Sequence, residues 1–163
     1  MTDMRHNRSR LDLTVRVRHG FGDPNSGAPY KTERTFLDFV VDGTSLYDAV
    51  GRSHDLASVL WISPASRGEQ NRAVRRLLLA EAGDASEGRV SLFVCPECGD
   101  LGCGAITAHL ERNGATIVWR DLGYENNYEA GVDFAPYERF GPYFFDADTY
   151  VVSLQRVLDT KGG

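Results

Sequence analysis

This chain of 163 residues lacks several sequence patterns that assign a function directly. No segment approaches the roughly 20 apolar residues that cross a bilayer, so no membrane partner is expected. Residues 1–10 are polar and contain no apolar stretch of the signal-peptide type, so we expect a cytoplasmic protein. The sequence has neither a G-x-x-x-x-G-K-[ST] phosphate loop nor a G-x-S-x-G nucleophile elbow. It therefore predicts no catalytic or nucleotide-binding residues.

Long runs of positive charge are also missing, and the formal net charge is -5 with a pI of about 5.3. A protein that binds nucleic acid normally concentrates positive charge to neutralise phosphates, so no nucleic-acid partner is expected. A net negative surface instead attracts a basic protein partner.

The remaining composition is typical of a globular protein, with 42% hydrophobic and 25% charged residues. A chain of this length buries about two thirds of its unfolded-chain surface in one domain. We expect residues 1–9 to form a flexible tail and residues 10–160 a single α+β domain. Its mainly antiparallel sheet should be covered on one face by two or three helices.

Strands are predicted where apolar and polar residues alternate, over residues 11–18, 37–41 and 90–94. Asn113-Gly114 favours a two-residue hairpin turn, which would place Leu110 opposite Ile117 and Ala108 opposite Trp119. Residues 89–121 should therefore form the central strands.

Helices are predicted from capping residues followed by apolar stripes. Ser45 precedes a short helix, and Ser66 precedes a longer one that Gly83 would end. Asp146 would cap the last helix, whose buried stripe comprises Tyr150, Val151, Leu154, Val157 and Leu158.

All three cysteines lie in one motif, Cys95-Pro-Glu-Cys98-Gly-Asp-Leu-Gly-Cys103-Gly. Thiolates are soft, charged donors that suit Zn²⁺, and two cysteines three positions apart can chelate one ion. Cys95 should end one strand and Cys103 begin another, so we predict a structural zinc site formed by Cys95, Cys98 and Cys103. The ion would hold the two strand ends together.

The spacing does not select a fourth zinc ligand. His109 lies roughly 20 Å along the predicted strand from Cys103, which excludes it, and we expect a partly exposed strand histidine there. His19, His54 and Asp100 remain candidates.

Two other interpretations of the cysteine cluster remain open. The thiols could be redox-active or nucleophilic, although that chemistry needs a nearby cation or helix N-terminus and the motif leads into a hairpin. Alternatively, the cysteines could simply pack as small apolar groups.

A second candidate site is the predicted long loop over residues 122–141, where carboxylates and tyrosines interleave. Exposed tyrosines beside carboxylates suit protein recognition, because tyrosine supplies a large contact area at low entropic cost. We predict partner binding through Tyr124, Glu125, Tyr128 and Glu129. A solvated loop, a general acid/base pair or hidden short elements are the alternatives.

The cysteine motif is followed by Val118-Trp-Arg-Asp-Leu122 and by Gly141-Pro-Tyr-Phe-Phe-Asp146. Over residues 90–158 these features resemble a group of uncharacterised bacterial proteins, chiefly actinobacterial, that share a CPxCGDxGCG loop. The resemblance implies no established activity. Some members carry an oxidoreductase label, but this sequence has no dinucleotide-binding fingerprint.

The sequence therefore favours a non-enzymatic binding protein with a zinc-holding cysteine cluster, of the kind that neutralises a basic protein as an immunity protein does. The alternative is a thiol-dependent oxidoreductase that uses Cys95 and Cys98.

Overall fold

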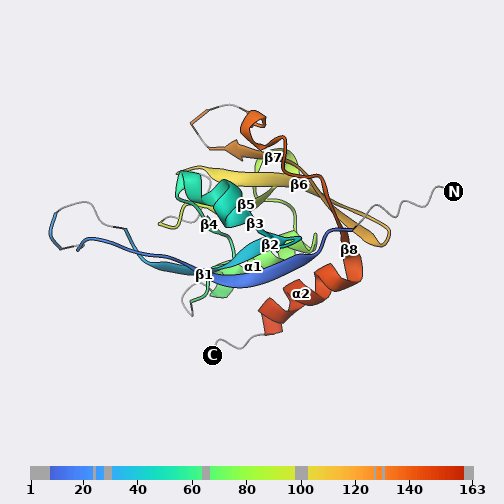
Figure 1. Ribbon diagram of the computed structural model, residues 1–163, viewed down its shortest axis with the longest axis horizontal. Helices are drawn as coiled ribbons and strands as arrows, with labels where there is room; N and C mark the ends of the chain where they lie inside the picture. The colour runs from blue at the N-terminus through green and yellow to red at the C-terminus, as the bar shows by residue number, and fades with distance from the viewer. Residues whose placement is uncertain are drawn as a thin grey trace.

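Two antiparallel sheets form the framework of the computed structural model (Figure 1). The first sheet has the order β1-β2-β3, with β1 (Leu11–Arg18), β2 (Arg34–Val41) and β3 (Thr44–Ser45). The second has the order β4-β5-β6-β7-β8, with β4 (Ala57–Ser58), β5 (Val90–Val94), β6 (Ala105–Asn113), β7 (Thr116–Glu125) and β8 (Tyr143–Asp146). The structure describes residues 8–23, 25–27, 31–63, 67–97, 103–126, 128–129 and 131–159. The predicted α+β class is confirmed, and β5, β6 and β7 are central in their sheet, as expected.

The helices are α1 (Arg67–Leu77) and α2 (Ala147–Asp159), with the short turns η1 (Tyr47–Gly51), η2 (Arg52–His54), η4 (Ser86–Gly88) and η6 (Ala135–Tyr137). Asp146 caps α2 as predicted, because its Oδ2 accepts a hydrogen bond of 3.0 Å from the Thr149 N–H. The Ser45 hydroxyl caps the turn before η1 by accepting a 3.0 Å bond from the Asp48 N–H. The predicted capping box at Ser66 lies outside the described residues.

Trp119 of β7 lies at the centre of the core. Its ring packs edge-on against Phe39 of β2 at 5.4 Å and against Phe145 of β8 at 5.1 Å between centroids. Such pairs contribute roughly 0.5–1.5 kcal/mol each beyond their buried area. The indole N–H donates to the hydroxyl of Tyr150 in α2, and that hydroxyl donates to the carbonyl of Leu77 at the end of α1. Both helices are thus tied to one strand.

The two sheets are joined at both ends. Phe36 of β2 pairs with Trp61, just beyond β4, and Ser9 pairs with Phe145 of β8. Arg8 forms an ion pair of 2.8 Å with Asp146. Residues 8 and 9, which the sequence assigned to the tail, therefore contact the second sheet, and residues 1–7 lie outside the described part of the chain.

The register of the β6–β7 hairpin differs from the prediction by two residues. Leu110 pairs with Trp119, and Asn113 pairs with Thr116, so Gly114 and Ala115 form the turn. Gly114 supplies the positive φ of 62°. Because side chains alternate with a period of two, the shift keeps Leu110 and Trp119 on the apolar face.

A bulge follows in the same hairpin. The pairing of β6 with β7 shifts between Thr107 and His109, and Asp121 on β7 has a left-handed φ of 55°. The extra residue gives β7 a local bend and turns the Asp121 side chain out of the regular alternation.

The end of α1 also differs from the prediction. Leu79, with a φ of 62°, takes the left-handed position after the helix instead of Gly83. Glycine is needed at position 83 because of close packing, since a Cβ there would lie 2.1 Å from the carbonyl oxygen of Gly88.

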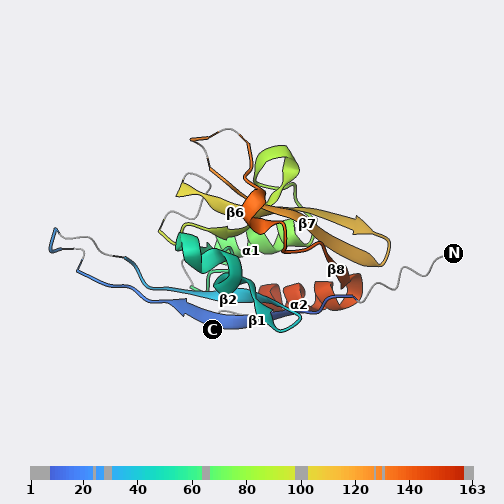
Figure 2. The same cartoon turned by 45° about the horizontal axis from the view of Figure 1, so that its top comes forward.

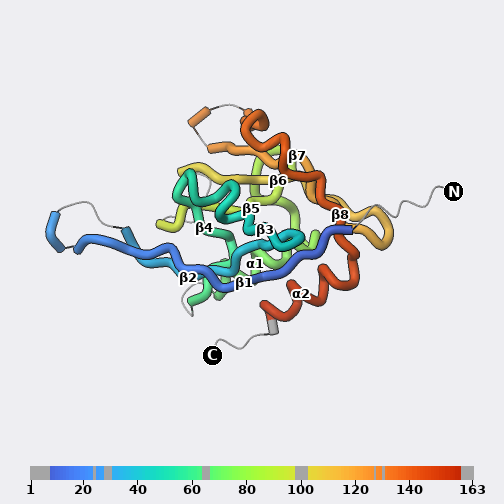
Figure 3. Tube along the Cα trace, viewed as in Figure 1, coloured from blue at the N-terminus to red at the C-terminus, as the bar shows by residue number. Residues whose placement is uncertain are grey.

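Strand β1 is only partly covered. Leu11 is buried, whereas Val15 is 62% exposed and Arg18 is only 5% exposed. The β1–β2 hairpin extends beyond the sheets (Figure 2), and Figure 3 shows that β1 begins near β8 and leads into this hairpin. The apolar side chains of β1 are therefore buried near Leu11 and exposed at Val15 and Val17.

Among the described residues, no helix is both long enough and apolar enough to cross a bilayer.

Candidate functional site

The hairpin end that carries the cysteines is the first candidate site. Val94, the last residue of β5, pairs with Ala105, the first residue of β6. Cys95 therefore follows this pair directly, and Cys103 precedes it by two positions, at the same end of the sheet. Cys95 is half-buried and Cys103 is exposed. Cys98 and Asp100 lie outside the described residues.

One aromatic ring packs on Gly104, the residue before β6, and a second ring stacks on the first. Gly104 has a φ of 104°, and a Cβ there would lie 2.0 Å from the hydroxyl oxygen of Tyr124. Only glycine lets Tyr124 approach this closely. The Tyr124 ring stacks on His54 with centroids 4.8 Å apart.

His54 is fixed from its other side by Tyr137. Its Nε2 lies 2.6 Å from the Tyr137 hydroxyl, which makes a hydrogen bond between the two rings. Tyr137 is 5% exposed, and burial raises the pKa of its phenol, so the hydroxyl stays neutral. Among the candidate fourth ligands, His54 therefore lies beside the cysteine end, one ring away from Gly104.

An ion-pair cluster holds the first residues of the cysteine motif. Arg18 donates to both oxygens of Asp55, at 3.2 and 2.9 Å, and to Glu97 at 3.0 Å. Glu97 also accepts a 2.9 Å hydrogen bond from the Thr32 N–H, and Lys31 pairs with Asp55. Burial alone would raise the pKa values of both carboxyls, but these hydrogen bonds outweigh burial and hold the pKa values below their usual range.

Arg34 provides a second anchor for the motif. Its Nε and Nη2 donate to the Pro96 carbonyl at 3.0 and 2.8 Å, and its guanidinium lies 3.8 Å from the centroid of the Trp61 ring. The stretch from Cys95 to Glu97 is therefore docked on the base of the β1–β2 hairpin. Sequence reasoning missed Arg18, Arg34 and Asp55, because their contacts with the motif are long-range and leave no local pattern.

The other histidines lie elsewhere. His19 is exposed, with its Nδ1 3.7 Å from a Glu33 carboxylate oxygen. His109 is half-buried on β6 and lies 3.2 Å from Glu111, as expected for a partly exposed strand histidine. Neither lies in the cluster around Cys95.

The chemical type of the donors at the cysteine end suits zinc. Cys95 and Cys103 supply two thiols at one sheet end, the donors that Zn²⁺ prefers. The part of the chain that the structure describes contains no group of three or more His, Cys, Asp and Glu side chains placed to hold a metal ion. A site with three thiols needs Cys98, which is outside that part.

The predicted partner-binding residues divide into two pairs. Tyr124 and Glu125 belong to β7, and Glu125 is 6% exposed. Its carboxylate accepts a 2.6 Å hydrogen bond from the Thr107 hydroxyl and lies 3.4 Å from Arg89. Glu125 therefore serves the interior and is not displayed to a partner.

Tyr128 and Glu129 point outward. Tyr128 is 83% exposed and Glu129 is also exposed. The side-chain oxygen of Asn126 accepts hydrogen bonds of 2.9 Å from both of their N–H groups, which fixes the backbone of this turn.

The predicted long loop over residues 122–141 contains short elements. β7 continues to Glu125, Tyr124 pairs with Asp133, and η6 follows at Ala135–Tyr137. The alternation that extends β7 is interrupted by Gly123, which conceals the strand in the sequence. This glycine is required, because a Cβ there would lie 2.4 Å from Val132.

Comparison with protein-family models, with curated proteins and with solved structures gave no match to this chain.

Proposed function

We propose that this protein is a non-enzymatic binding protein that recognises a basic protein partner, in the manner of a neutralising immunity protein. The observation that carries the proposal is the exposed surface of the segment from Asp121 to Glu138. We call this surface the acidic–aromatic face. Its exposed acidic and aromatic side chains, among the described residues, are Asp121, Tyr128, Glu129, Asp133, Phe134 and Glu138.

The chemistry of this face suits a basic partner. Aromatic side chains supply contact area at low entropic cost, and carboxylates steer a positively charged partner during encounter. The net charge of -5 adds a long-range attraction for a positively charged partner. The hydrogen bonds to Asn126 already order the backbone of this turn. Binding through Tyr128 therefore costs little further conformational entropy.

The cysteine end has a structural role in this proposal. Cys95, Cys98 and Cys103 would hold a zinc ion that ties the end of β5 to the start of β6, with His54 the best-placed fourth ligand among the described candidates. The ion would lie close to Tyr124, and through β7 it would stabilise the strand from which the acidic–aromatic face continues.

A thiol-dependent oxidoreductase that uses Cys95 and Cys98 is the rival. A reactive thiol needs a cation to stabilise its thiolate. The charges of Arg18 and Lys31 are neutralised by Asp55 and Glu97, and Arg34 directs its guanidinium to the Pro96 carbonyl. In the part of the chain that the structure describes, Cys95 is followed by the turn at Pro96 and Glu97. Both observations favour structural thiols.

Affinity capture from lysate of the native host tests the binding proposal. The wild-type chain should retain a basic protein in stoichiometric amount, and retention should weaken at high salt. The double variant Tyr128→Ala/Glu129→Lys should lose it, whereas Glu69→Lys on α1, an exposed charge reversal outside the face, should keep it. Equal retention by all three chains, or no stoichiometric protein at all, would contradict the proposal.

A further inference from the structure

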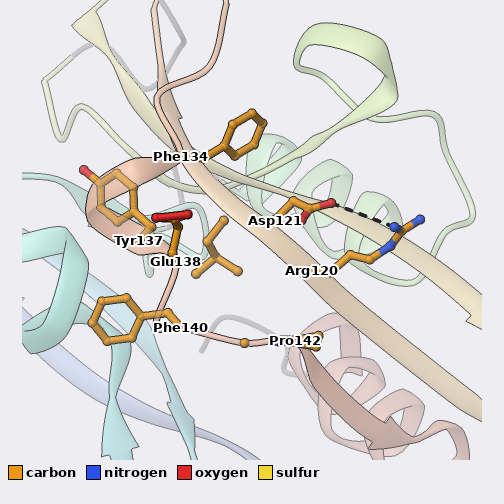
Figure 4. A pocket seen from close by; sticks show the side chains of 9 residues that line it. Arg120, Asp121, Phe134, Tyr137, Glu138, Phe140 and Pro142 are labelled. Carbon is orange, nitrogen blue, oxygen red and sulfur yellow. Dashed lines mark ion pairs between the residues drawn. The ribbon is translucent and has the colours of Figure 1, made fainter.

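A pocket of about 370 Å³ lies beside β7, between this strand and the segment that leads through η6 to β8 (Figure 4). Leu122 and Tyr137, both buried, line its inner part. Phe134 and Phe140 line it from the η6 segment. Ligand pockets typically measure about 300–1,000 Å³, so this one suits a single side chain or a small molecule.

Two acidic residues line the pocket from different elements, and the Asp121 carboxylate is turned toward Arg120 (Figure 4). Asp121 comes from the bulge in β7 and Glu138 from the turn after η6 (Figure 4). Within the described chain, the Glu138 carboxylate has neither a hydrogen bond nor an ion pair, and the Asp121 carboxylate has an ion pair of 3.9 Å with Arg120 and a longer-range attraction to Arg89. Both negative charges are therefore poorly neutralised.

The one basic side chain in the lining does not reverse this balance. Arg120 directs its Nε and Nη2 to Glu111, at 3.0 and 2.6 Å. Arg89, beneath Phe134, is neutralised by the buried Glu125. Arg139, which lies near the lining residue Phe140, adds one more positive charge. The three carboxylates of Asp121, Glu138 and Glu111 still outnumber the guanidiniums of Arg120 and Arg139, so the net charge around the pocket is negative.

The aromatic walls favour the same ligand. The face of an aromatic ring attracts cations, most strongly when water is excluded. Both phenylalanines already have a guanidinium of this chain nearby, since Arg89 lies 5.1 Å from the Phe134 centroid and Arg139 lies 4.9 Å from that of Phe140. Aromatic rings beside poorly neutralised carboxylates are the pattern that binds organic cations.

We propose that this pocket binds an ammonium or guanidinium group carried on a short alkyl chain. The inference rests on the proposed function, because an arginine or lysine side chain of a basic partner is the source that the adjoining acidic–aromatic face would deliver. The alkyl stem would pack on Leu122 and the rings, and the cationic head would lie between Asp121 and Glu138.

An NMR titration of the full chain with n-butylguanidinium chloride tests the proposal. The amide signals of Leu122 and Tyr137 should shift saturably, and the neutral analogue butyramide should leave them unmoved. The double variant Asp121→Asn/Glu138→Gln should bind n-butylguanidinium about tenfold more weakly, because two partly exposed charge contacts are lost. Asparagine tolerates the left-handed backbone at position 121, so the bulge is retained.

The matched control is Glu69→Gln/Asp148→Asn, which removes the same charge from exposed positions on α1 and α2. This control should bind n-butylguanidinium as the wild type does. Absence of saturable shifts in the wild type, or equal affinity in both double variants, would overturn the proposal.

Two further comparisons distinguish a partner side chain from a small free cation as the ligand, and distinguish failure of the proposed function from failure of the pocket proposal. A short arginine-containing peptide that binds more tightly than n-butylguanidinium would support a partner side chain, and the reverse order would support a small free cation. If n-butylguanidinium binds while capture finds no partner, only the proposed function fails. If capture succeeds while n-butylguanidinium gives no saturable shifts, only the pocket proposal fails.

Discussion

At the scale of single residues, Asp38 and Asp55 occupy opposite environments. Asp38 is fully buried, and burial raises its pKa more than the hydrogen bonds from Ser45 and the Tyr47 N–H lower it. For Asp55, burial acts in the same direction, but the hydrogen bonds from Arg18 and Lys31 outweigh it and lower the pKa. Folding therefore favours the protonated form of Asp38 and the ionised form of Asp55.

These shifts predict opposite pH trends for two variants. The stability contributed by protonated Asp38 is complete below its unfolded pKa, about 3.9, and is lost as pH rises through the raised folded pKa. Asp38→Asn should therefore destabilise the protein more at pH 4 than at pH 7. The contribution of Asp55 is present above its unfolded pKa and is lost as pH falls through the lowered folded pKa, so Asp55→Asn should cost more at pH 7 than at pH 3.

Urea denaturation across this pH range measures both trends. Asp55 is 41% exposed, so solvent screening should keep the cost of Asp55→Asn at pH 7 to about 1 kcal/mol. If the destabilisation by both variants changed in the same direction with pH, the opposite pKa shifts assigned to Asp38 and Asp55 would be wrong.

At the scale of elements, the sequence predicted what depends on local patterns. The strands β5, β6 and β7 and the capped helix α2 were found from alternation and from Asp146. The register of the hairpin was wrong by two residues, because a period of two cannot distinguish registers that differ by two and Asn113 stayed in the strand. The Asn113 side chain donates a hydrogen bond to the Glu111 carboxylate, a contact made with Asn113 in the strand and not in the turn.

The candidate site was only partly predictable. The motif itself placed Cys95 and Cys103 at one sheet end, because they flank paired strands. The anchors Arg18 and Arg34 come from strands more than sixty residues earlier in the chain, and no local signal links them to Glu97 and Pro96. The burial of Glu125 was missed for the same reason, because its partner Arg89 precedes it by a whole hairpin.

Gly104, at the start of β6, carries a prediction for this element. Gly104→Ala should destabilise the protein by about 2–4 kcal/mol, from left-handed backbone strain and from overlap with the Tyr124 hydroxyl. Gly43→Ala is the matched control, since Gly43 has a φ of 82° with nothing within 4 Å of its Cβ, and it should cost about 1–2 kcal/mol. Chemical denaturation of both variants measures the difference, and equal costs would show that Tyr124 does not pack on Gly104.

At the scale of the whole molecule, one hydroxyl connects both helices to the sheet. The Tyr150 hydroxyl accepts from the Trp119 indole N–H and donates to the Leu77 carbonyl, and Tyr150 is 1% exposed. Burial raises the pKa of this phenol, so it remains a neutral donor at all physiological pH values.

Tyr150→Phe should therefore lower the free energy of unfolding by about 2–4 kcal/mol, because it leaves two buried polar groups without a hydrogen bond. Tyr128→Phe removes a hydroxyl from a side chain that is 83% exposed and should change it by less than about 0.5 kcal/mol. Thermal and urea unfolding compare the two, and a small effect of Tyr150→Phe would mean that water replaces its hydroxyl.

The central claim is that the chain works by binding a basic protein while its cysteine end holds zinc. Native mass spectrometry of the protein purified from its native host without added zinc measures both parts at once. The account predicts a complex with one basic protein partner, and a chain mass increased by a single zinc ion that disappears in Cys98→Ser. A spectrum that shows only the bare chain, with neither partner nor metal, would contradict it.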